Sequence, residues 1–301
     1  MEVCVTARSI SRAVLEQLQS EPPPASPAAL QVLAVFEHAC DLVTCNDQTP
    51  RSVIALVTPE IGDGPLNVVL NQRGWDAAII VPGTSAWAQG ERLRVCGLAI
   101  DLSAGDVWEP RPDWPALRDR LPAIEAGLPA LRVLGREHAH TGSLLAVLDE
   151  GSCEDPLPLA VLADARSGCQ ALEAGWRGDR TTLGEGAAQL AGLGSGLTPG
   201  GDDFLCGAMM WAWLAHPRPA VICGAIAETA APRTTTLSAA LLRAAARGEC
   251  SAAWHALLNA LARRDGIGLT RASRGVLRHG ATSGADTLAG FLWAGTRIGF
   301  G

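Results

Sequence analysis

Two glycine-rich segments carry the residues of this sequence that are best suited to chemistry. The first reads Gly-Leu-Thr-Pro-Gly-Gly-Asp-Asp over residues 196–203, and the second reads Gly-Ala-Thr-Ser-Gly-Ala-Asp-Thr over residues 280–287. Both fit the pattern G-x-T-x-G-x-D, and an apolar run with helical periodicity follows each. Their aspartates, Asp202 and Asp286, are 84 residues apart (286 − 202). We interpret the pair as one loop-and-helix unit that is used twice.

Segments of this composition favour anion binding. Threonine is a good N-cap residue, and proline or serine can occupy the first position of the helix that follows. A glycine in the first turn leaves backbone N–H groups uncovered, and these donors attract anions together with the helix dipole. We therefore predict a small anionic substrate at these two segments. The predicted substrate-binding residues are Gly196, Thr198, Gly200, Gly201, Thr282, Ser283, Gly284 and Thr287.

Three aspartates in these segments, Asp202, Asp203 and Asp286, are the candidate catalytic residues. Because carboxylates repel a bound phosphate, two functional arrangements stay open. In one, the three carboxylates bind Mg2+, which bridges them to the anion. In the other, they turn away and bond the opposite segment's backbone or a substrate amine. A purely structural interpretation is that they are acidic first turns of two capped helices, each worth about 0.3–1 kcal/mol.

A hydroxyl-rich segment before an amphipathic helix supplies further candidates. Thr235 and Ser238 either cap this helix or hold a substrate carboxylate. Arg243 either clamps a carboxylate or phosphate through two N–H groups or is solvated on the helix face. His279, beside the second segment, is the one histidine that we consider for acid–base chemistry. Cys206 follows the first segment, but no histidine or asparagine pattern supports a cysteine nucleophile.

Composition excludes several classes of protein. The chain has 301 residues, 24 basic and 31 acidic side chains, and a formal net charge of −7. No cluster of basic residues stands out, which argues against nucleic acid or a membrane surface as a partner. Nine cysteines at irregular spacing argue against a disulfide framework or a structural zinc site. Without a signal-peptide pattern or an apolar run of roughly 18 residues, we predict a cytoplasmic protein.

The distribution of residue types predicts an α+β protein. We expect a β-rich N-terminal domain over residues 1–112, barrel-like or sandwich-like, and then a mainly α-helical domain over residues 113–301 that carries both glycine-rich segments. The N-terminal domain should contain a short helix at 9–19 and a linker at 22–27. Its expected strands are 53–57, 66–70, 77–81 and 93–100. The expected helices of the second domain are 116–134, 156–175, 203–215, 219–231, 234–247, 251–264, 269–278 and 286–297.

The glycine-rich segments resemble a known family. Residues 193–203 and 282–290 are similar to the pattern of the AllH-like family, which includes a subunit of bacterial oxamate carbamoyltransferase from anaerobic allantoin breakdown. Thr235, Ser238 and Arg243 also match that pattern, and residues 36–42 and 62–69 match it more loosely. The sequence departs from the pattern at residue 281, where alanine replaces the family's histidine, so no role of that histidine carries over.

The resemblance implies a carbamoyltransferase subunit in purine and allantoin nitrogen catabolism. The implied small-molecule partners are phosphate, carbamoyl phosphate, oxamate and oxalurate, or a related carboxylate-amide in a paralogue. Backbone N–H groups of the two segments would hold phosphate and carboxylate, and an aspartate would orient the amide or a metal. The resemblance also implies a multi-subunit complex that needs other carbamoyltransferase subunits for activity. Mg2+ is the one cofactor that the carboxylates suggest.

Two other functions stay open. Aspartates at two helix starts are similar in outline to the dimagnesium ADP-ribosylhydrolases, which would make the chain a Mg-dependent hydrolase. Those enzymes have further acidic ligands near the N-terminus, whereas Glu37 and Asp41 fall in a strand-rich region without that pattern. Alternatively, the chain is a non-catalytic subunit that binds a small anion through the same segments. A mutant that binds its ligand normally but loses turnover would favour catalysis.

Overall fold

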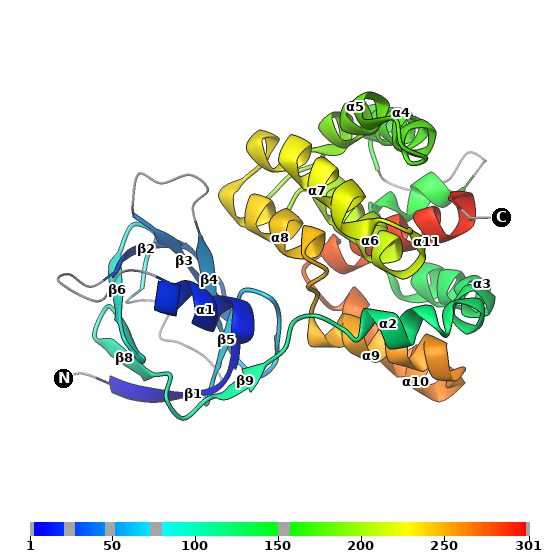
Figure 1. Ribbon diagram of the computed structural model, residues 1–301. Coiled ribbons are helices and arrows are strands. Elements are labelled where there is room, and N and C mark those ends of the chain that lie inside the picture. The colour runs from blue at the N-terminus through cyan, green and yellow to red at the C-terminus, as the bar shows by residue number, and fades with distance from the viewer. Residues whose placement is uncertain (1–2, 21–27, 46–51, 73–79, 150–156, 299–301) are drawn as a thin grey trace. The chain divides into compact units, whose positions relative to one another are not determined.

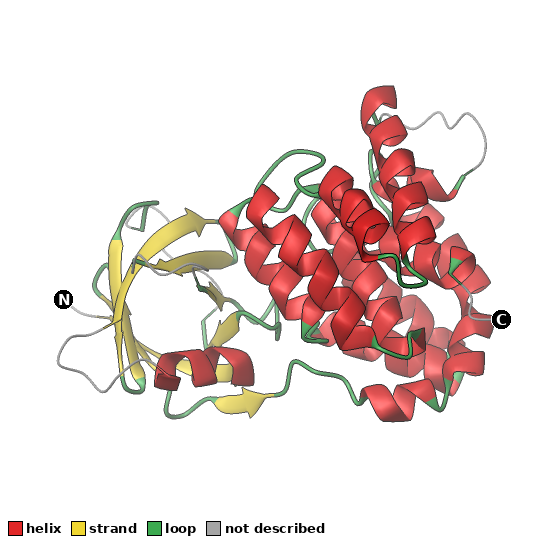
Figure 2. Cartoon of the chain, turned by 45° about the horizontal axis from the view of Figure 1, so that its top comes forward, coloured by secondary structure: helices red, strands yellow, loops and turns green. Residues whose placement is uncertain are grey.

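The chain forms two compact units, Met1–Pro110 and Arg111–Gly301 (Figure 1). The computed structural model describes residues 3–20, 28–45, 52–72, 80–149 and 157–298. Strands are confined to the first unit, and helices dominate the second (Figure 2). The structure is 54% helical and 18% strand, and its barrel followed by a mainly helical region confirms the predicted α+β class.

Eight strands of the first unit close into a barrel, and a ninth strand lies outside the closure. The hydrogen-bonded order is β5-β4-β3-β2-β6-β7-β8-β1-β9, and an antiparallel pairing of β1 with β5 closes the ring. On the edge of β1 opposite β5, the two ends of the strand have different partners. Val3–Thr6 pair with β8, and Ser9–Ser11 pair with β9. The strands are β1 (Val3–Ser11), β2 (Ala28–Val35), β3 (Ala39–Thr44), β4 (Val53–Val57), β5 (Asn67–Leu70), β6 (Ser85–Gln89), β7 (Arg92–Val95), β8 (Leu98–Asp101) and β9 (Asp106–Trp108).

Apolar side chains fill the core of this barrel, as the short β-branched runs predict. Leu42, Ile54 and Leu56 have no exposed surface, and every residue of β4 is buried. Alternate residues of neighbouring strands supply the core of a small closed barrel. Two expected strands, 53–57 and 66–70, are confirmed as β4 and β5 within one residue.

Four sequence-based expectations for this unit need correction or fall outside the described residues. The expected helix at 9–19 begins only at α1 (Arg12–Ser20), because residues 9–11 pair with two strands. The expected strand 93–100 is two strands, since Cys96 (φ 45°) and Gly97 (φ 77°) form a left-handed turn between them. The expected linker 22–27 and most of the expected strand 77–81 lie outside the described residues.

Asp41 on β3 gives the barrel a pH-dependent stability. Its side chain is 4% exposed, and burial raises its pKa to about 6. The folded state therefore keeps a proton that the unfolded chain releases near pH 4. Stability should fall as the pH rises from about 4 through 6, by on the order of 3 kcal/mol. Asp41→Asn should remove this slope, measured by hydrogen exchange of the β3 and β4 amides. An unchanged slope would contradict the assignment.

Ten α-helices and two short 3₁₀ helices make up the described part of the second unit. They are α2 (Trp114–Arg118), α3 (Leu121–His138), η1 (Leu144–Leu148), α4 (Leu159–Gly175), α5 (Arg180–Leu190), α6 (Gly200–Ala215), α7 (Pro219–Ala230), η2 (Ala231–Arg233), α8 (Thr236–Ala246), α9 (Ala252–Arg263), α10 (Gly266–Leu277) and α11 (Ser283–Arg297). All eight expected segments are helical over most of their length, although 116–134 is divided into α2 and α3. No helix in the described residues is long and apolar enough to span a membrane.

Helix α5 was missed because Gly184 and Gly186 lower its intrinsic helix propensity. The structure shows why a glycine is required at position 186. A Cβ there would lie 2.5 Å from the backbone nitrogen of Leu172 in α4, so the glycine permits α4 and α5 to pack closely. Tertiary packing thus overrides the local preference of the sequence.

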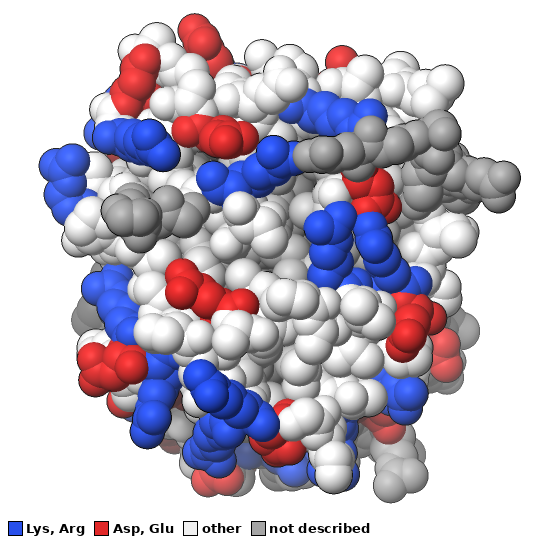
Figure 3. Space-filling view, turned by 90° about the vertical axis from the view of Figure 1, so that its right-hand side faces the viewer, with Lys and Arg blue, Asp and Glu red and all other residues white. Residues whose placement is uncertain are grey.

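Helices α6 and α11 form the centre of the second unit. Trp211 of α6 packs edge-on against Phe291 of α11, with ring centroids 5.4 Å apart, and Phe204 packs against Trp293 at 5.5 Å. Both helices are buried over nearly their whole circumference, as the apolar run after the first glycine-rich segment predicts. On the face shown in Figure 3, arginine and acidic side chains alternate rather than forming one continuous basic surface.

Candidate functional site

The two glycine-rich segments meet in the folded chain. Each forms the loop that enters a central helix, the first leading into α6 and the second into α11. Thr198 Oγ1 and Ser283 Oγ lie 2.9 Å apart and share a hydrogen bond across 85 residues of sequence. The structure therefore brings together the starts of the two helices, as the repeated pattern predicted.

The repeat has a register of 83 residues in the structure, not the 84 expected from the sequence. Asp203 and Asp286 each occupy the fourth position of their helix (286 − 203 = 83), while Asp202 lies one position earlier. The difference arises at the helix starts, because α6 begins after Pro199 and α11 begins after Thr282. Asp203 is thus the structural counterpart of Asp286.

The same register relates the contacts between the two helices. A Cβ added at Gly207 would overlap the carbonyl oxygen of Thr287, and one at Gly290 would overlap that of Phe204. The two glycines are 83 residues apart (290 − 207), and so are the two contacted residues (287 − 204), so the crossing has approximate two-fold symmetry. Because the backbones touch here, only glycine fits at both positions.

The glycines of the first helical turns also serve packing. The Gly201 N–H donates to the Leu193 carbonyl, and the Gly284 N–H donates to the His279 carbonyl, both at 2.9 Å. These two amides are already bonded within the fold and are not free donors for an anion, so the substrate-binding role of the two glycines stays a prediction. The missing Cβ instead lets each helix approach the helix before it. The contacted carbonyl oxygens are those of Leu190 and Val276.

Asp202 is buried and fully hydrogen-bonded within the fold. Its Oδ1 accepts the N–H of Gly192 at 3.0 Å, and its Oδ2 accepts the hydroxyls of Thr234 and Ser238, the latter at 2.8 Å. Burial raises the pKa of Asp202, and the three hydrogen bonds oppose that rise. Asp202 therefore ties α6 to α8 and to the loop after α5, as a positioning residue.

Asp286 reaches from α11 to the start of α6. Its Oδ1 accepts the N–H of Leu144 in η1 at 2.6 Å, and its Oδ2 lies 2.9 Å from where a Cβ of Gly200 would be. Gly200 is the first residue of α6, so the carboxylate lies at the positive end of that helix's dipole. No sequence pattern pointed to Leu144, because its contribution is a backbone donor from a distant segment.

Asp203 makes the equivalent crossing in the opposite direction. The Ser283 hydroxyl, on the first residue of α11, lies close enough to lower the pKa of the Asp203 carboxyl group, while the buried Oδ2 of Asp203 has no hydrogen-bond partner among the described residues. Burial first, and then the nearby Asp286 and Asp202, raise the pKa of Asp203 well above its ordinary value, against a lowering by Ser283. Asp203 is therefore suited to hold a proton.

A line of hydroxyl groups leads away from this carboxyl group. Ser283 lies beside Asp203 and shares a hydrogen bond with Thr198, and both hydroxyl-bearing residues are partly exposed. Pro199, not Thr198, is the N-cap residue of α6, so the Thr198 hydroxyl does not cap its helix. Thr198 and Ser283 are the predicted residues best placed to meet a ligand.

Two more predicted threonines support the loops. Thr235 Oγ1 donates to the Leu197 carbonyl and accepts the N–H of Ser238 at 3.1 Å, which confirms its capping of α8. Thr287 Oγ1 donates to the Ser283 carbonyl at 2.7 Å within α11. At the outer ends of the loops, Gly196 (φ 88°) and Gly280 (φ 64°) adopt left-handed conformations that favour glycine.

Three further candidates are not drawn into this cluster. Within the described chain, no hydrogen bond or ion pair joins the half-buried Arg243 to either loop. His279 as a whole is an exposed residue, burial of its imidazole lowers the pKa of that ring, and its link to the second loop is a backbone carbonyl. Burial and the nearby Asp203 raise the pKa of the Cys206 thiol, which opposes formation of a nucleophilic thiolate.

The three aspartates do not come together as metal ligands. Among the described residues, no group of three or more His, Cys, Asp or Glu side chains is placed to hold a metal ion. The physical reason is that Asp202 is turned toward Gly192, Thr234 and Ser238. The Mg2+ arrangement considered from the sequence therefore does not fit these three side chains as a set.

Comparison with known families identifies the class of protein. Residues 190–295 match the family described as oxamate carbamoyltransferase subunit AllH, and residues 6–107 match the AllH family N-terminal domain. No solved structure matches the chain. The first match spans both loops, α6 and α11, and the second spans most of the barrel unit. The chain belongs to the AllH family, as the resemblance of its glycine-rich segments predicted.

Proposed function

We propose that the chain is a subunit that carries out carbamoyl transfer between oxamate nitrogen and phosphate, at the crossing of α6 and α11. The observation that supports this most is the line of polar groups formed by the buried Asp203, the neighbouring Ser283 and Thr198, in which Ser283 and Thr198 share a hydrogen bond. It joins a carboxyl group of raised pKa to two partly exposed hydroxyls, which suits proton transfer at a bound amide.

The reaction requires such a proton. In the direction that consumes oxalurate, a phosphate oxygen attacks the carbamoyl carbon and forms a tetrahedral intermediate. The bond from that carbon to the oxamate nitrogen then breaks, and the nitrogen must take up a proton as it leaves. Asp203 supplies this proton through the Ser283 hydroxyl and recovers one in the reverse direction. Ser283 and Thr198 contact the reacting amide and fix its orientation.

The remaining elements of the proposal concern the surroundings of this site. The family description speaks of a subunit, and we propose that other carbamoyltransferase subunits complete the substrate site. We place the assembly in the cytoplasm, in the nitrogen catabolism of purines through allantoin. Phosphate, carbamoyl phosphate and oxamate are the proposed ligands. A Mg2+ ion, where one takes part, would need ligands beyond the three aspartates.

Removing the hydroxyl link tests the proposal. Ser283→Ala, in the chain assembled with its partner subunits, should lower the rate of oxalurate phosphorolysis by about 10²–10⁴, the usual contribution of general acid catalysis. Thr198→Val should give a smaller loss in the same direction. The matched control is Ser251→Ala, since Ser251 lies at the start of α9 without a side-chain capping bond.

Binding must be measured alongside turnover. Calorimetry with carbamoyl phosphate and oxamate should show that Ser283→Ala still binds ligand within a few-fold of the unmodified assembly. Turnover that persists at the wild-type rate in Ser283→Ala would overturn the catalytic role. If binding were lost as well, this would indicate the non-catalytic, anion-binding alternative.

A further inference from the structure

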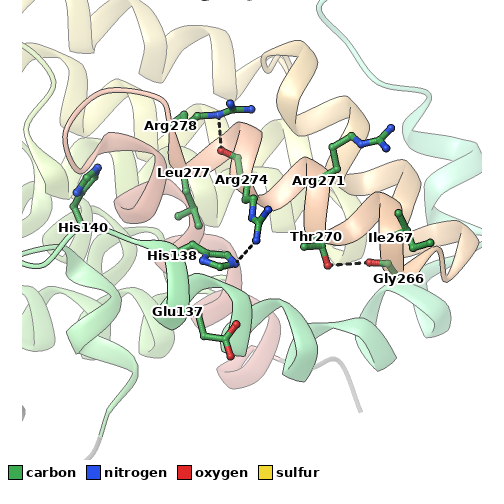
Figure 4. A pocket seen from close by; sticks show the side chains of 10 residues that line it. All are labelled: Glu137, His138, His140, Gly266, Ile267, Thr270, Arg271, Arg274, Leu277 and Arg278. Carbon is green, nitrogen blue, oxygen red and sulfur yellow. Dashed lines mark hydrogen bonds between the residues drawn. The ribbon is translucent and has the colours of Figure 1, made fainter.

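A basic cavity lies between the end of α3 and the outer face of α10, apart from the cluster of aspartates. Its volume is about 900 Å3, within the range of small-molecule sites. Figure 4 shows the residues that line it, with Arg274 reaching from α10 to His138 at the end of α3. The lining residues are Glu137, His138, His140, Gly266, Ile267, Thr270, Arg271, Arg274, Leu277 and Arg278.

Acidic partners for the arginines of this cavity are absent from the part of the chain that the structure describes. Among the described residues, no carboxylate pairs with Arg271, Arg274 or Arg278. Arg274 instead contacts a ring nitrogen of His138 at 3.4 Å, and Arg278 donates to the backbone carbonyl of Arg274. Elsewhere on α3, by contrast, Arg132 and Arg136 both pair with Asp149. Three arginines against the single Glu137 give the cavity a formal charge of +2, in a chain whose net charge is −7.

The spacing of these arginines selects a ligand with several anionic groups. Positions 271, 274 and 278 follow one face of α10, and the outer two are about 10 Å apart at 1.5 Å per residue. Guanidinium groups bind phosphate oxygens through paired N–H donors. A chain of two or three phosphates carries charged oxygens along its length, so it can contact several of these guanidinium groups at once and is favoured over a single phosphate or carboxylate. Ile267, 79% exposed at the rim, adds an apolar surface beside the charges.

We infer that this cavity binds a molecule with a chain of two or three phosphates, such as a nucleoside di- or triphosphate. The phosphates lie along Arg271, Arg274 and Arg278, and an attached ring system contacts Ile267. This site is separate from the proposed transfer reaction, and its occupancy does not depend on it. Leu277 and Arg278 line the cavity and directly precede the loop that enters α11. At the start of that loop, the carbonyl of His279 accepts the Gly284 N–H.

Titration calorimetry of the full chain tests the inference with three probes: inorganic phosphate, tripolyphosphate and ATP, each without added metal. We expect saturable binding of tripolyphosphate and ATP, much weaker binding of phosphate, and a marked weakening as the salt concentration rises. Tighter binding of ATP than of tripolyphosphate, lost in Ile267→Ser, would identify a nucleotide. Equal binding of the two would identify the phosphate chain alone as the recognised group.

Arginine variants locate the site. Arg274→Ala and Arg271→Ala should each weaken tripolyphosphate binding at least tenfold. Arg263→Ala is the matched control, since Arg263 is an exposed arginine in the last turn of α9 outside the cavity. Thermal unfolding of each variant checks that the fold is intact. Absence of saturable polyphosphate binding, or an equal loss in Arg263→Ala, would overturn the inference. Capture of an acidic partner segment in place of polyphosphate would also overturn it.

Discussion

Replacing Gly207 with alanine will destabilise the helical unit by about 3 kcal/mol or more, the upper range for overpacking in a rigid core. The added methyl group would overlap the carbonyl oxygen of Thr287, and the backbone of α11 can move aside only by opening the central helix pair. Gly290→Ala should have a similar effect through the carbonyl of Phe204. Thermal unfolding should show a fall of roughly 6–12 °C for a unit of this size.

Gly224→Ala is the matched control for this prediction. Gly224 lies inside α7, and a Cβ added there would meet no atom within 4 Å. Alanine at such a helical position should stabilise the protein by about 0.5–1 kcal/mol. The two glycine classes should therefore respond with opposite signs. Toleration of alanine at both Gly207 and Gly290 would show that α6 and α11 do not cross in backbone contact.

The second large effect is expected from the neighbouring carboxyl groups Asp203 and Asp202. Asp203→Asn should raise stability at neutral pH by about 1–3 kcal/mol, because asparagine stays neutral and avoids the cost of ionising a carboxyl group that is buried beside Asp286 and Asp202. Asp202→Asn should lower stability by a similar amount. The amide NH2 of asparagine replaces one of the two carboxylate oxygens, so the residue can no longer accept either the hydrogen bond from Gly192 or those from Thr234 and Ser238.

The pH dependence gives this prediction a sign. Because the pKa of Asp203 is raised in the folded state, its contribution to stability is greatest below the unfolded pKa of about 3.9 and is lost as the pH rises through the folded value. Asp203→Asn should remove that loss, as measured by urea unfolding across the pH range. The same variant should abolish oxalurate phosphorolysis in the assembly. A variant that is more stable but less active is expected where a group that lowers stability is needed for activity.

Two results would contradict this account of Asp203. Destabilisation by Asp203→Asn would show that its Oδ2 has a hydrogen-bond partner in solution. Full activity of the same variant would show that the proton for the leaving nitrogen comes from another group.

The residue types and spacing of the two loops were enough to predict that both helix starts contribute to one site, since a repeated helix start implies equivalent roles. The same spacing misplaced the equivalent of Asp286 by one residue. The helix boundary at Pro199 decides that register, and boundaries depend on tertiary contacts that local patterns do not encode. The different bonding partners of Asp202 and Asp286 could not be predicted either, because Gly192 and Leu144 contribute only backbone N–H groups.

The fold class was predictable because periodicity alone separates short β-branched runs from long helical ones. Its errors have local causes. The strand expected at 93–100 contains a tight turn at a non-glycine residue, Cys96, which no composition rule anticipates. Helix α5 contains glycines that argue against a helix until the packing against α4 is known. In both cases a tertiary requirement outweighs a local preference.

The pairing of α6 with α11 also has a kinetic consequence. Their glycine contacts join residues about 80 positions apart in the chain, whereas α4 with α5 and α9 with α10 pair with near neighbours. Closing the longer loop has the higher entropic cost, and long-range contacts slow folding. We expect the short helical hairpins to gain protection from hydrogen exchange first during refolding. The starts of α6 and α11 should become protected only in the last, slowest phase.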